Sequence, residues 1–247
     1  PAGSMGRNVY RGSCVWRGQH WHTAGMSDAF PLSQPCEDRD FADWHQNCPW
    51  CAVWVVWIAS DAVDATIQAA RHALGDALLS RYARQPHLTV AYRGLCDEMA
   101  HVAAEFGPAQ LQADLAALQA LAQPPFAVQL QGVGSFTTVP YLGVGQGADT
   151  LARLHDALVP WPPAPGWHYV PHVTLGHYAR ALPLLWAVDQ LHTVGVGQPL
   201  LPLEVQQLAL VRYASHDIAG PLVLEGLWDL QQQRYLPQPG ALWGTTG

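Results

Sequence analysis

Two short segments of the chain share one pattern, and this pattern constrains the fold more than any other feature of the sequence. Residues 86–90 and 171–175 each read proline, histidine, an apolar residue, threonine and a second apolar residue. In a β-strand, alternate side chains face the same way. As strands, both segments would therefore present a histidine and a threonine side by side on one face and bury their apolar side chains behind it.

The elements predicted around these segments occur twice in the same order, which is strand, helix, histidine strand, helix and strand. The first half places them at about 51–59, 61–82, 86–92, 97–105 together with 109–122, and 126–133. The second half places them at about 139–144, 149–159, 168–178, 183–194 and 203–213, with a further strand at 221–230. The separation of His87 and His172 along the chain is close to that of the first strands of the two halves. The chain is therefore predicted to be an internal duplication with a pseudo-two-fold axis.

Three parts of the chain differ in composition. Residues 1–50 are rich in Gly, Ser, Arg, Trp and His without clear periodicity, so we expect an extension of mostly irregular structure. Residues 51–230 carry the regular pattern, with lobes at about 51–135 and 136–230. The tail, 231–247, is polar and rich in proline and glycine, and we expect it to be poorly ordered.

The composition argues against several classes of function. No apolar run approaches the length of a membrane span, and the first residues lack the basic and then apolar pattern of a secretory signal. The five cysteines are an odd number, which argues against a disulfide framework and for a reducing compartment. We therefore expect a cytoplasmic protein, and we take it to be a monomer. The net charge of −7, with only 12 Lys and Arg residues, argues against binding to long duplex nucleic acid, which needs a basic surface.

One pair of cysteines has a spacing that is common among metal ligands. Two residues separate Cys48 from Cys51, and His45 and Cys36 could complete a tetrahedral zinc site. Cys51, however, begins a predicted buried strand, and the chain contains one such cysteine pair only. We therefore assign no metal site and no cofactor, and zinc stays open as an alternative.

The paired strands and their context resemble the two-histidine phosphoesterase superfamily, which includes the bacterial RNA 2′,3′-cyclic phosphodiesterases, also called 2′-5′ RNA ligases. His87-Leu88-Thr89-Val90 and His172-Val173-Thr174-Leu175 match the two motifs of that family. Ala52-Val53-Trp54-Val55 is similar to its first strand, and Gly132-Val133-Gly134-Ser135-Phe136 to the segment that enters its second half. The resemblance covers about residues 51–230 and leaves residues 1–50 outside.

The resemblance implies an α+β, bilobal and duplicated fold, in which two antiparallel sheets face a central cleft and the helices lie outside. It also implies that the catalytic residues are His87, Thr89, His172 and Thr174. Histidine suits both proton-transfer tasks, because its unperturbed pKa near 6.5 lets it hold or release a proton near neutrality. The threonine hydroxyls can donate hydrogen bonds to the non-bridging phosphate oxygens, where charge accumulates. No metal is required.

Residues near the two motifs are candidates for substrate binding. Tyrosine rings could stack on a base. Many bacterial members of the family carry a basic residue, often arginine, two positions after the second motif, where this chain has His177; His177 or Arg180 could replace that residue. His168 is predicted at the rim of the site. The substrate-binding candidates are Tyr92, Tyr141, His168, His177, Tyr178 and Arg180.

The function expected from these features is metal-independent hydrolysis of 2′,3′-cyclic phosphates on nucleotides or RNA 3′-ends. Two alternatives stay open. One is a phosphodiesterase of 2′-5′-linked or cyclic signalling oligonucleotides, and the other is a non-catalytic nucleotide-binding module that keeps the pocket.

Overall fold

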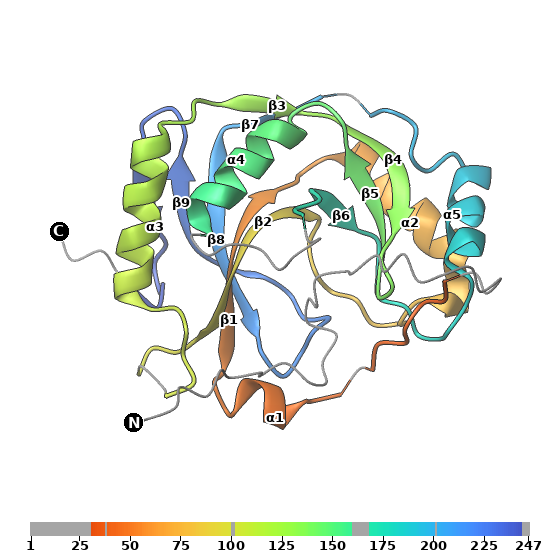
Figure 1. The fold of residues 1–247 in the computed structure, drawn as a ribbon, viewed down its shortest axis with the longest axis horizontal. Helices are drawn as coiled ribbons and strands as arrows, with labels where there is room; N and C mark the ends of the chain where they lie inside the picture. Colours follow the sequence, from red (N-terminus) through yellow and green to blue (C-terminus); the bar gives the residue numbers. More distant parts are fainter. Residues whose placement is uncertain (1–30, 38, 100–101, 160–167, 201, 244–247) are drawn as a thin grey trace, which may run out of the picture.

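The computed structural model, which describes residues 31–37, 39–99, 102–159, 168–200 and 202–243, shows an α+β fold (Figure 1). The strands are β1 (Trp50–Trp57), β2 (His87–Cys96), β3 (Phe126–Val128), β4 (Leu130–Ser135), β5 (Pro140–Val144), β6 (His172–Thr174), β7 (Leu203–Val205), β8 (Gln207–Ala214), β9 (Val223–Asp229) and β10 (Arg234–Pro237). The helices are α1 (Ala42–His45), α2 (Asp61–Leu74), the 3₁₀ helix η1 (Gly75–Ala77), α3 (Pro108–Leu121), α4 (Ala148–Leu158) and α5 (Leu184–Thr193). The pairings between these described strands are all antiparallel, which confirms the predicted fold class.

The strands of the two halves meet along the two histidine strands. The large sheet has the order β10-β9-β8-β1-β2-β6-β5-β4, and β3 pairs with β7 in a small second sheet. The two halves of the large sheet touch at the β2–β6 junction, where the register contains a single residue pair, Leu88 with Val173. Instead of two separate sheets, the lobes thus form one sheet, because the edges of β2 and β6 lie close enough to pair.

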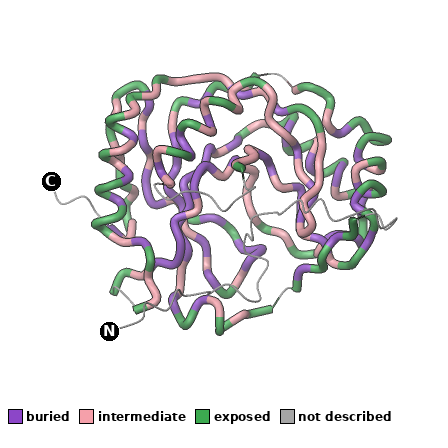
Figure 2. The backbone as a smooth tube through the Cα atoms, viewed as in Figure 1, coloured by how far each residue is buried: buried purple, intermediate pink, exposed green. Residues whose placement is uncertain are grey.

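Helices cover one face of the large sheet and enclose the main hydrophobic core. In Figure 1, α3 and α4 lie over one half of the sheet, and α2 and α5 lie beside the other; α4 contacts β2, and α5 contacts β4. The apolar residues of both motifs are buried in this core, namely Leu88, Val90, Val173 and Leu175. The predicted division of each motif between a buried face and a polar face is therefore confirmed, and Figure 2 shows buried residues concentrated along the central strands.

A second, smaller hydrophobic cluster lies on the other side of β1. It contains Val53 and Val55 of β1 together with Val211 and Tyr213 of β8. Thr89 pairs with Val55 in the β1–β2 register, so its side chain lies on the same side of the sheet as this cluster. The face that carries the motif polar residues is thus supported by packed side chains.

A buried ion pair joins β2 to the helices. Both Arg93 of β2 and Asp114 of α3 are buried, and the guanidinium donates Nε–H and Nη2–H to the two carboxylate oxygens at 2.9 Å each. The Trp54 indole donates to Asp114 Oδ2 at 2.8 Å, and Arg93 Nη1 donates to the carbonyl of Leu158, at the end of α4, at 2.7 Å. One carboxylate therefore connects β1, β2 and α3, and Arg93 extends the network to α4.

Several predicted boundaries are wrong, and glycines explain two of them. The second helix ends at Leu74 instead of Tyr82, because Gly75 adopts φ 49° and ψ −123°, which does not continue a helix. The first histidine strand continues past Gly94 to Cys96, since Gly94, with φ +95°, lies beside a register shift that bends the strand without ending it. The helix predicted over 97–105 is wrong: the described residues of this range form turns and irregular backbone.

The positive φ at Gly94 makes one prediction about stability. Replacing Gly94 by alanine is expected to destabilise the chain by about 1–3 kcal/mol, because φ +95° is strained for any residue with a Cβ. The added Cβ would also collide with the Glu105 carboxylate, which accepts a hydrogen bond from Leu95 N. Urea unfolding measures the effect. Gly240 has φ +79° with open space around it, so Gly240→Ala is a control that carries strain without the collision; equal losses in both variants would contradict the packing argument.

Other predicted strands are shorter or divided. The second histidine strand is only three residues long, and the segments predicted at 126–133 and 203–213 each form two strands. In both divided segments the chain passes from the small sheet into the large one. The helix predicted at about 149–159 begins at Ala148 after Gly147, so Asp149 lies in its first turn.

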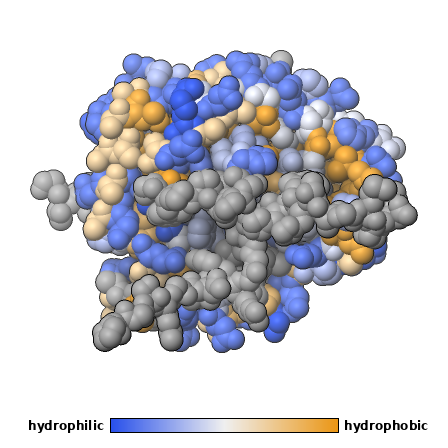
Figure 3. Space-filling view, viewed as in Figure 1, coloured by the Kyte–Doolittle hydropathy of each residue, from blue (hydrophilic) through white to orange (hydrophobic). Residues whose placement is uncertain are grey.

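The described part of the N-terminal extension is mostly irregular, as expected. Residues 31–37 pack on the second half, where the Ser33 backbone donates to the Leu182 carbonyl at 2.8 Å, and residues 1–30 lie outside the described part. In the tail, β10 pairs with β9, so the predicted lack of order is wrong there. Figure 3 shows apolar residues gathered on the side where α5 lies, and the exposed apolar residues include Leu185 and Trp186 of that helix. Among the described residues, no helix combines the length and apolar character needed to cross a bilayer.

Candidate active site

The pairing of β2 with β6 brings the two motifs together. Leu88 lies opposite Val173 in an antiparallel register. Extended by one residue on each side, this register directs His87 toward Thr174 and Thr89 toward His172. Because side chains alternate along a strand, all four polar side chains belong to the face opposite the buried apolar residues. The arrangement assembles one site from two segments that are far apart in the sequence.

The two histidines are anchored in the same way. Nδ1 of His87 lies 2.7 Å from the carbonyl oxygen of Gln85, and Nδ1 of His172 lies 2.8 Å from that of Val170. A carbonyl oxygen only accepts, so each Nδ1 carries the hydrogen and donates it to the main chain two residues earlier. This contact fixes the tautomer, and Nε2 is then the nitrogen of each ring that can exchange a proton with a ligand.

Burial makes both histidines weak bases. Loss of solvation lowers the pKa of His87 to about 4 and that of His172 to about 4. The positive charges of Arg84 and of protonated His172 also lower the pKa of His87. The two imidazoles are thus close enough to interact electrostatically, and both are neutral at pH 7.

Aromatic rings surround His172. The centroids of the Phe136 and Tyr141 rings lie 4.9 Å and 5.3 Å from that of its imidazole. Tyr141 also pairs with Thr174 in the β5–β6 register. The structure therefore places the predicted residue Tyr141 at the site. Phe136 was not selected from the sequence, although it follows the strand that enters the second half.

A second tyrosine ties the two histidine strands together. The Tyr169 hydroxyl donates to the Thr89 carbonyl at 2.7 Å, and its ring stacks on His155 at 4.3 Å between centroids. His155 Nδ1 in turn donates to the Val90 carbonyl at 2.7 Å. Sequence reasoning missed both residues, because His155 lies on a helix and nothing in the sequence shows that it reaches β2. Their contacts hold the segment before β6 against β2.

The segment between η1 and β2, residues 78–86, forms a further wall, and we call it the connector. Leu79 N donates to the His177 carbonyl at 2.8 Å, which holds the connector beside the loop after the second motif. The Tyr82 ring lies 5.4 Å from the His177 ring, and burial lowers the pKa of His177 to about 4. The Arg84 guanidinium lies 3.9 Å above the centroid of the Tyr213 ring. Sequence reasoning did not select Arg84, although it precedes His87 by three residues.

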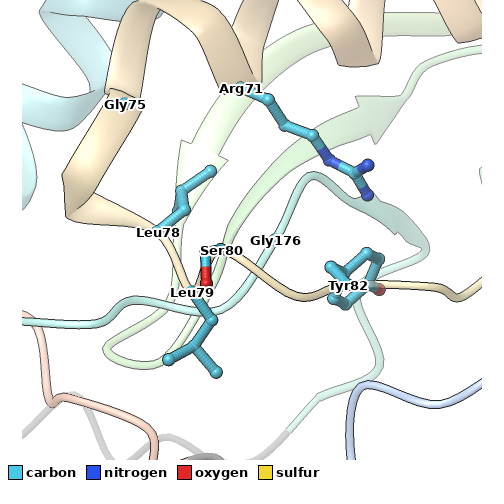
Figure 4. Close-up of a pocket in the computed structure, with 7 residues that line it drawn as sticks. All are labelled: Arg71, Gly75, Leu78, Leu79, Ser80, Tyr82 and Gly176. Carbon is cyan, nitrogen blue, oxygen red and sulfur yellow. The ribbon is translucent and has the colours of Figure 1, made fainter.

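A pocket lies beside the connector, with Tyr82 in its lining (Figure 4). Its lining includes Arg71, Ser80 and Gly176, and Figure 4 shows the Arg71 guanidinium directed toward the Tyr82 ring. Arg71 Nε donates to the Leu175 carbonyl at 3.1 Å, and its guanidinium carbon lies 4.8 Å from the Tyr82 centroid. The pocket therefore adjoins the loop that follows the second motif.

The other predicted substrate-binding residues have different surroundings. Tyr178 is completely buried, and its hydroxyl lies 2.6 Å from Ser135 Oγ, so the structure places this residue in the core. Arg180 lies at the surface and pairs with Asp76 at 3.2 Å. His168 is exposed and lies before β6. The fourth, Tyr92, lies on the motif face of β2, and its hydroxyl is 3.7 Å from Cys51 Sγ.

The structure does not assemble the alternative zinc site. The Cys36 thiol approaches the Thr138 carbonyl in the second half, whereas the Cys48 thiol approaches the Cys96 carbonyl in the first. His45 lies 2.6 Å from Asp40 Oδ1. No group of three or more histidine, cysteine or acidic residues within the described ranges is placed to hold a metal ion.

An α+β fold with a histidine–threonine pair on each of two adjoining antiparallel strands is the arrangement expected of two-histidine phosphoesterases. Residues 59–217 match the family model described as the 2′-5′ RNA ligase superfamily. The match covers more than half of the chain, and the chain belongs to that superfamily. The family resemblance inferred from the two motifs is therefore confirmed. The comparison with curated protein sequences finds no match.

Several solved structures resemble the fold at low sequence identity. A crystal structure of a phosphoesterase is 18% identical, with a TM-score of 0.49 over 74% of this chain and 99% of the other. E. coli LigT complexed with ATP is also 18% identical, with a TM-score of 0.46 over 74% of this chain and 99% of LigT. Kluyveromyces marxianus Usb1 with uridine monophosphate is 11% identical, with a TM-score of 0.43 over 77% of this chain and 99% of Usb1.

Proposed function

We propose that this chain hydrolyses 2′,3′-cyclic phosphates of nucleotides or RNA ends by general acid–base catalysis. The observation that carries the proposal is the matched anchoring of His87 and His172, each of which donates Nδ1–H to the carbonyl two residues before it. Two imidazoles in the same tautomer, on adjoining antiparallel strands, present two equivalent Nε2 atoms to one face. They supply both proton-transfer groups that opening a cyclic phosphodiester needs.

The proposed reaction is an in-line displacement at phosphorus. One histidine accepts a proton from water through Nε2 while the water oxygen bonds to phosphorus. The other histidine, as imidazolium, gives its Nε2 proton to the ribose oxygen whose bond to phosphorus breaks. Thr89 and Thr174 donate hydroxyl hydrogen bonds to the non-bridging oxygens, where negative charge accumulates. The proton count balances, since one histidine gains the proton that the other loses.

The substrate itself helps to prepare the acid. With a pKa lowered to about 4, each histidine is neutral at pH 7 and ready to act as a base. The acid, however, must carry a proton. An anionic phosphodiester next to the imidazolium favours its charged form, and therefore raises the pKa of that histidine in the complex. Binding and protonation of the acid are thus coupled.

A substrate panel tests the proposal. The wild-type chain is incubated with 2′,3′-cyclic mononucleotides, 2′-5′ oligoadenylates and cyclic dinucleotides, and the products are separated by chromatography. We expect each cyclic mononucleotide to give one phosphomonoester. Turnover of the oligoadenylates or cyclic dinucleotides alone would favour a signalling phosphodiesterase. Binding without any turnover would overturn the proposal in favour of a nucleotide-binding module.

The lowered pKa values predict an acidic optimum for kcat/KM, which reports the protonation of the unbound enzyme. The active form carries one proton shared by two histidines whose pKa values are about 4. Its fraction should therefore fall about tenfold per pH unit above about pH 5. The alkaline decline of kcat should lie at higher pH than that of kcat/KM, because bound phosphate raises the pKa of the acid. Initial rates between pH 4 and 8 measure both profiles, and a flat kcat/KM from pH 5 to 8 would contradict this assignment.

A further inference from the structure

In this chain, the loop after the second motif provides no arginine that could bind the phosphate of a substrate. The position two residues after the second motif holds His177, and Arg180 lies at the surface beside Asp76. An anionic phosphodiester held against two imidazoles nevertheless needs donors that carry positive charge, since such hydrogen bonds are the strong ones. The described part of the chain offers another arginine beside the first motif, on the connector.

The backbone on both sides of Arg84 is held in place. Ala83 N donates to the Ala219 carbonyl at 2.8 Å, and Pro86 accepts a hydrogen bond from Ile58 N at 3.0 Å. The Gln85 side chain forms two hydrogen bonds with the backbone of Leu222, at 2.9 Å and 3.2 Å. The Arg84 guanidinium is thus carried by a fixed segment, and its central carbon lies over the Tyr213 ring. Pre-organisation of this kind reduces the entropy lost when a ligand binds.

One donor of the guanidinium, Nε, is unsatisfied. Its Nε is buried and has no hydrogen-bond partner, and Arg84 forms no ion pair with a carboxylate among the residues that the structure describes. The Nδ1 atom of His177 is likewise buried and without a partner. A buried donor left unsatisfied destabilises the protein, and an anion that accepts its hydrogen bond would remove that cost.

The charge of Arg84 acts on both neighbouring histidines. It lowers the pKa of His87, whose Nδ1 bonds to the residue that follows Arg84, and it lowers the pKa of His177. Arg84 precedes His87 by three residues, and it is carried by the connector, whose Leu79 N donates to the His177 carbonyl, so its segment joins the first motif to the loop after the second. This position suits a group that holds the phosphate while the two motif histidines exchange protons.

We propose that Arg84 binds a non-bridging oxygen of the substrate phosphate, with His177 as the second polar group of the same anion subsite. The proposal rests on the proposed function for the identity of the phosphodiester, but binding of a phosphate anion does not depend on turnover. Arg84 then replaces, from the connector, the cation that the second motif lacks.

The test compares Arg84→Met with Arg153→Met in the full chain. Arg153 is an exposed arginine on α4, and its side chain contacts Gln123 and Thr150 instead of the site. Binding of inorganic phosphate is measured by calorimetry. Loss of a charged hydrogen bond of about 1.5–3 kcal/mol predicts a roughly 10–100-fold weaker affinity in Arg84→Met and no change in Arg153→Met. Equal phosphate affinity in both variants, or no phosphate binding by the wild-type chain, would overturn the subsite.

Two further measurements separate phosphate binding from folding. The imidazole signals of His87 and His177, followed by NMR against pH, should titrate at higher pH in Arg84→Met, because a positive charge has been removed, and should not move in Arg153→Met. If Arg84→Met melts early, Arg84→Lys keeps the charge, and it should bind phosphate more tightly than Arg84→Gln at similar melting temperature; equal affinities would contradict the proposal. If the substrate panel shows no turnover, the phosphate measurements still decide the role of Arg84.

Discussion

Alanine in place of His87 or His172 is expected to lower kcat/KM for 2′,3′-cyclic nucleotides by about 10²–10⁴-fold, the usual contribution of a positioned acid or base. Either variant leaves one imidazole, which can carry out one proton transfer but not both. The double variant is expected to lose little more than each single one, because the two groups act as a unit. Initial rates at several substrate concentrations measure the effect.

Controls must distinguish a loss of catalysis from a loss of the folded structure. His172 is buried and contacts two aromatic rings, so His172→Gln is a second variant that fills more of the space. His192→Ala serves as the matched control, since His192 is exposed in the last turn of α5. All variants should keep the wild-type near-ultraviolet circular dichroism spectrum. Near-wild-type turnover in a folded His87 or His172 variant would exclude the proposed acid–base pair.

Alanine in place of Asp114 is expected to destabilise the fold by about 3–5 kcal/mol, the usual cost of breaking a buried ion pair. The variant would leave the buried Arg93 guanidinium without its carboxylate, and the Trp54 indole without its acceptor. Since a small domain is stable by only about 5–15 kcal/mol, this loss is a large part of the total. Denaturant unfolding at pH 7 gives the free-energy difference.

Two further variants isolate the cause of this loss. In Arg93→Met combined with Asp114→Leu, both charges are absent, and we expect the double variant to be more stable than Asp114→Ala. Asp189→Ala removes an exposed carboxylate from α5 and should change the free energy of unfolding by less than about 0.5 kcal/mol. A loss below about 1 kcal/mol in Asp114→Ala would show that the buried pair contributes little to this fold.

The motif residues were predictable because their signal is local. Period-two alternation around His87 and His172 indicates which side chains share a face, and the cores that bury Leu88 and Val173 confirm it. The substrate-binding tyrosines were harder to predict. The sequence around a tyrosine near a motif looks the same whether its ring lies in the core or at the site. Tyr141 lies beside His172, whereas Tyr178 is buried behind the sheet and bonded to Ser135. Burial of a single tyrosine depends on packing that neighbouring residues do not encode.

Boundaries failed where tertiary contacts or one backbone angle outweigh local preference. The residue types that follow Leu74 do not by themselves predict the end of this helix. The helix ends there because Gly75 adopts dihedral angles that do not continue it. The strand predicted at about 168–178 is shorter in the structure, where β6 begins at His172 and ends at Thr174. The tail gained order because β9 provides an edge with which Arg234–Pro237 can pair. Propensity could not show that partner.

The sequence by itself determined the family, the division of each motif into a polar and an apolar face, and the four residues proposed for catalysis, because these depend on residue type and period-two spacing. Only the tertiary structure decided how the two motif strands meet. It paired Leu88 with Val173, anchored both histidines to the main chain and placed the Arg84 guanidinium over the Tyr213 ring. These relations join residues that are far apart in the chain, and they arise from strand pairing and burial, which act through space rather than along the sequence.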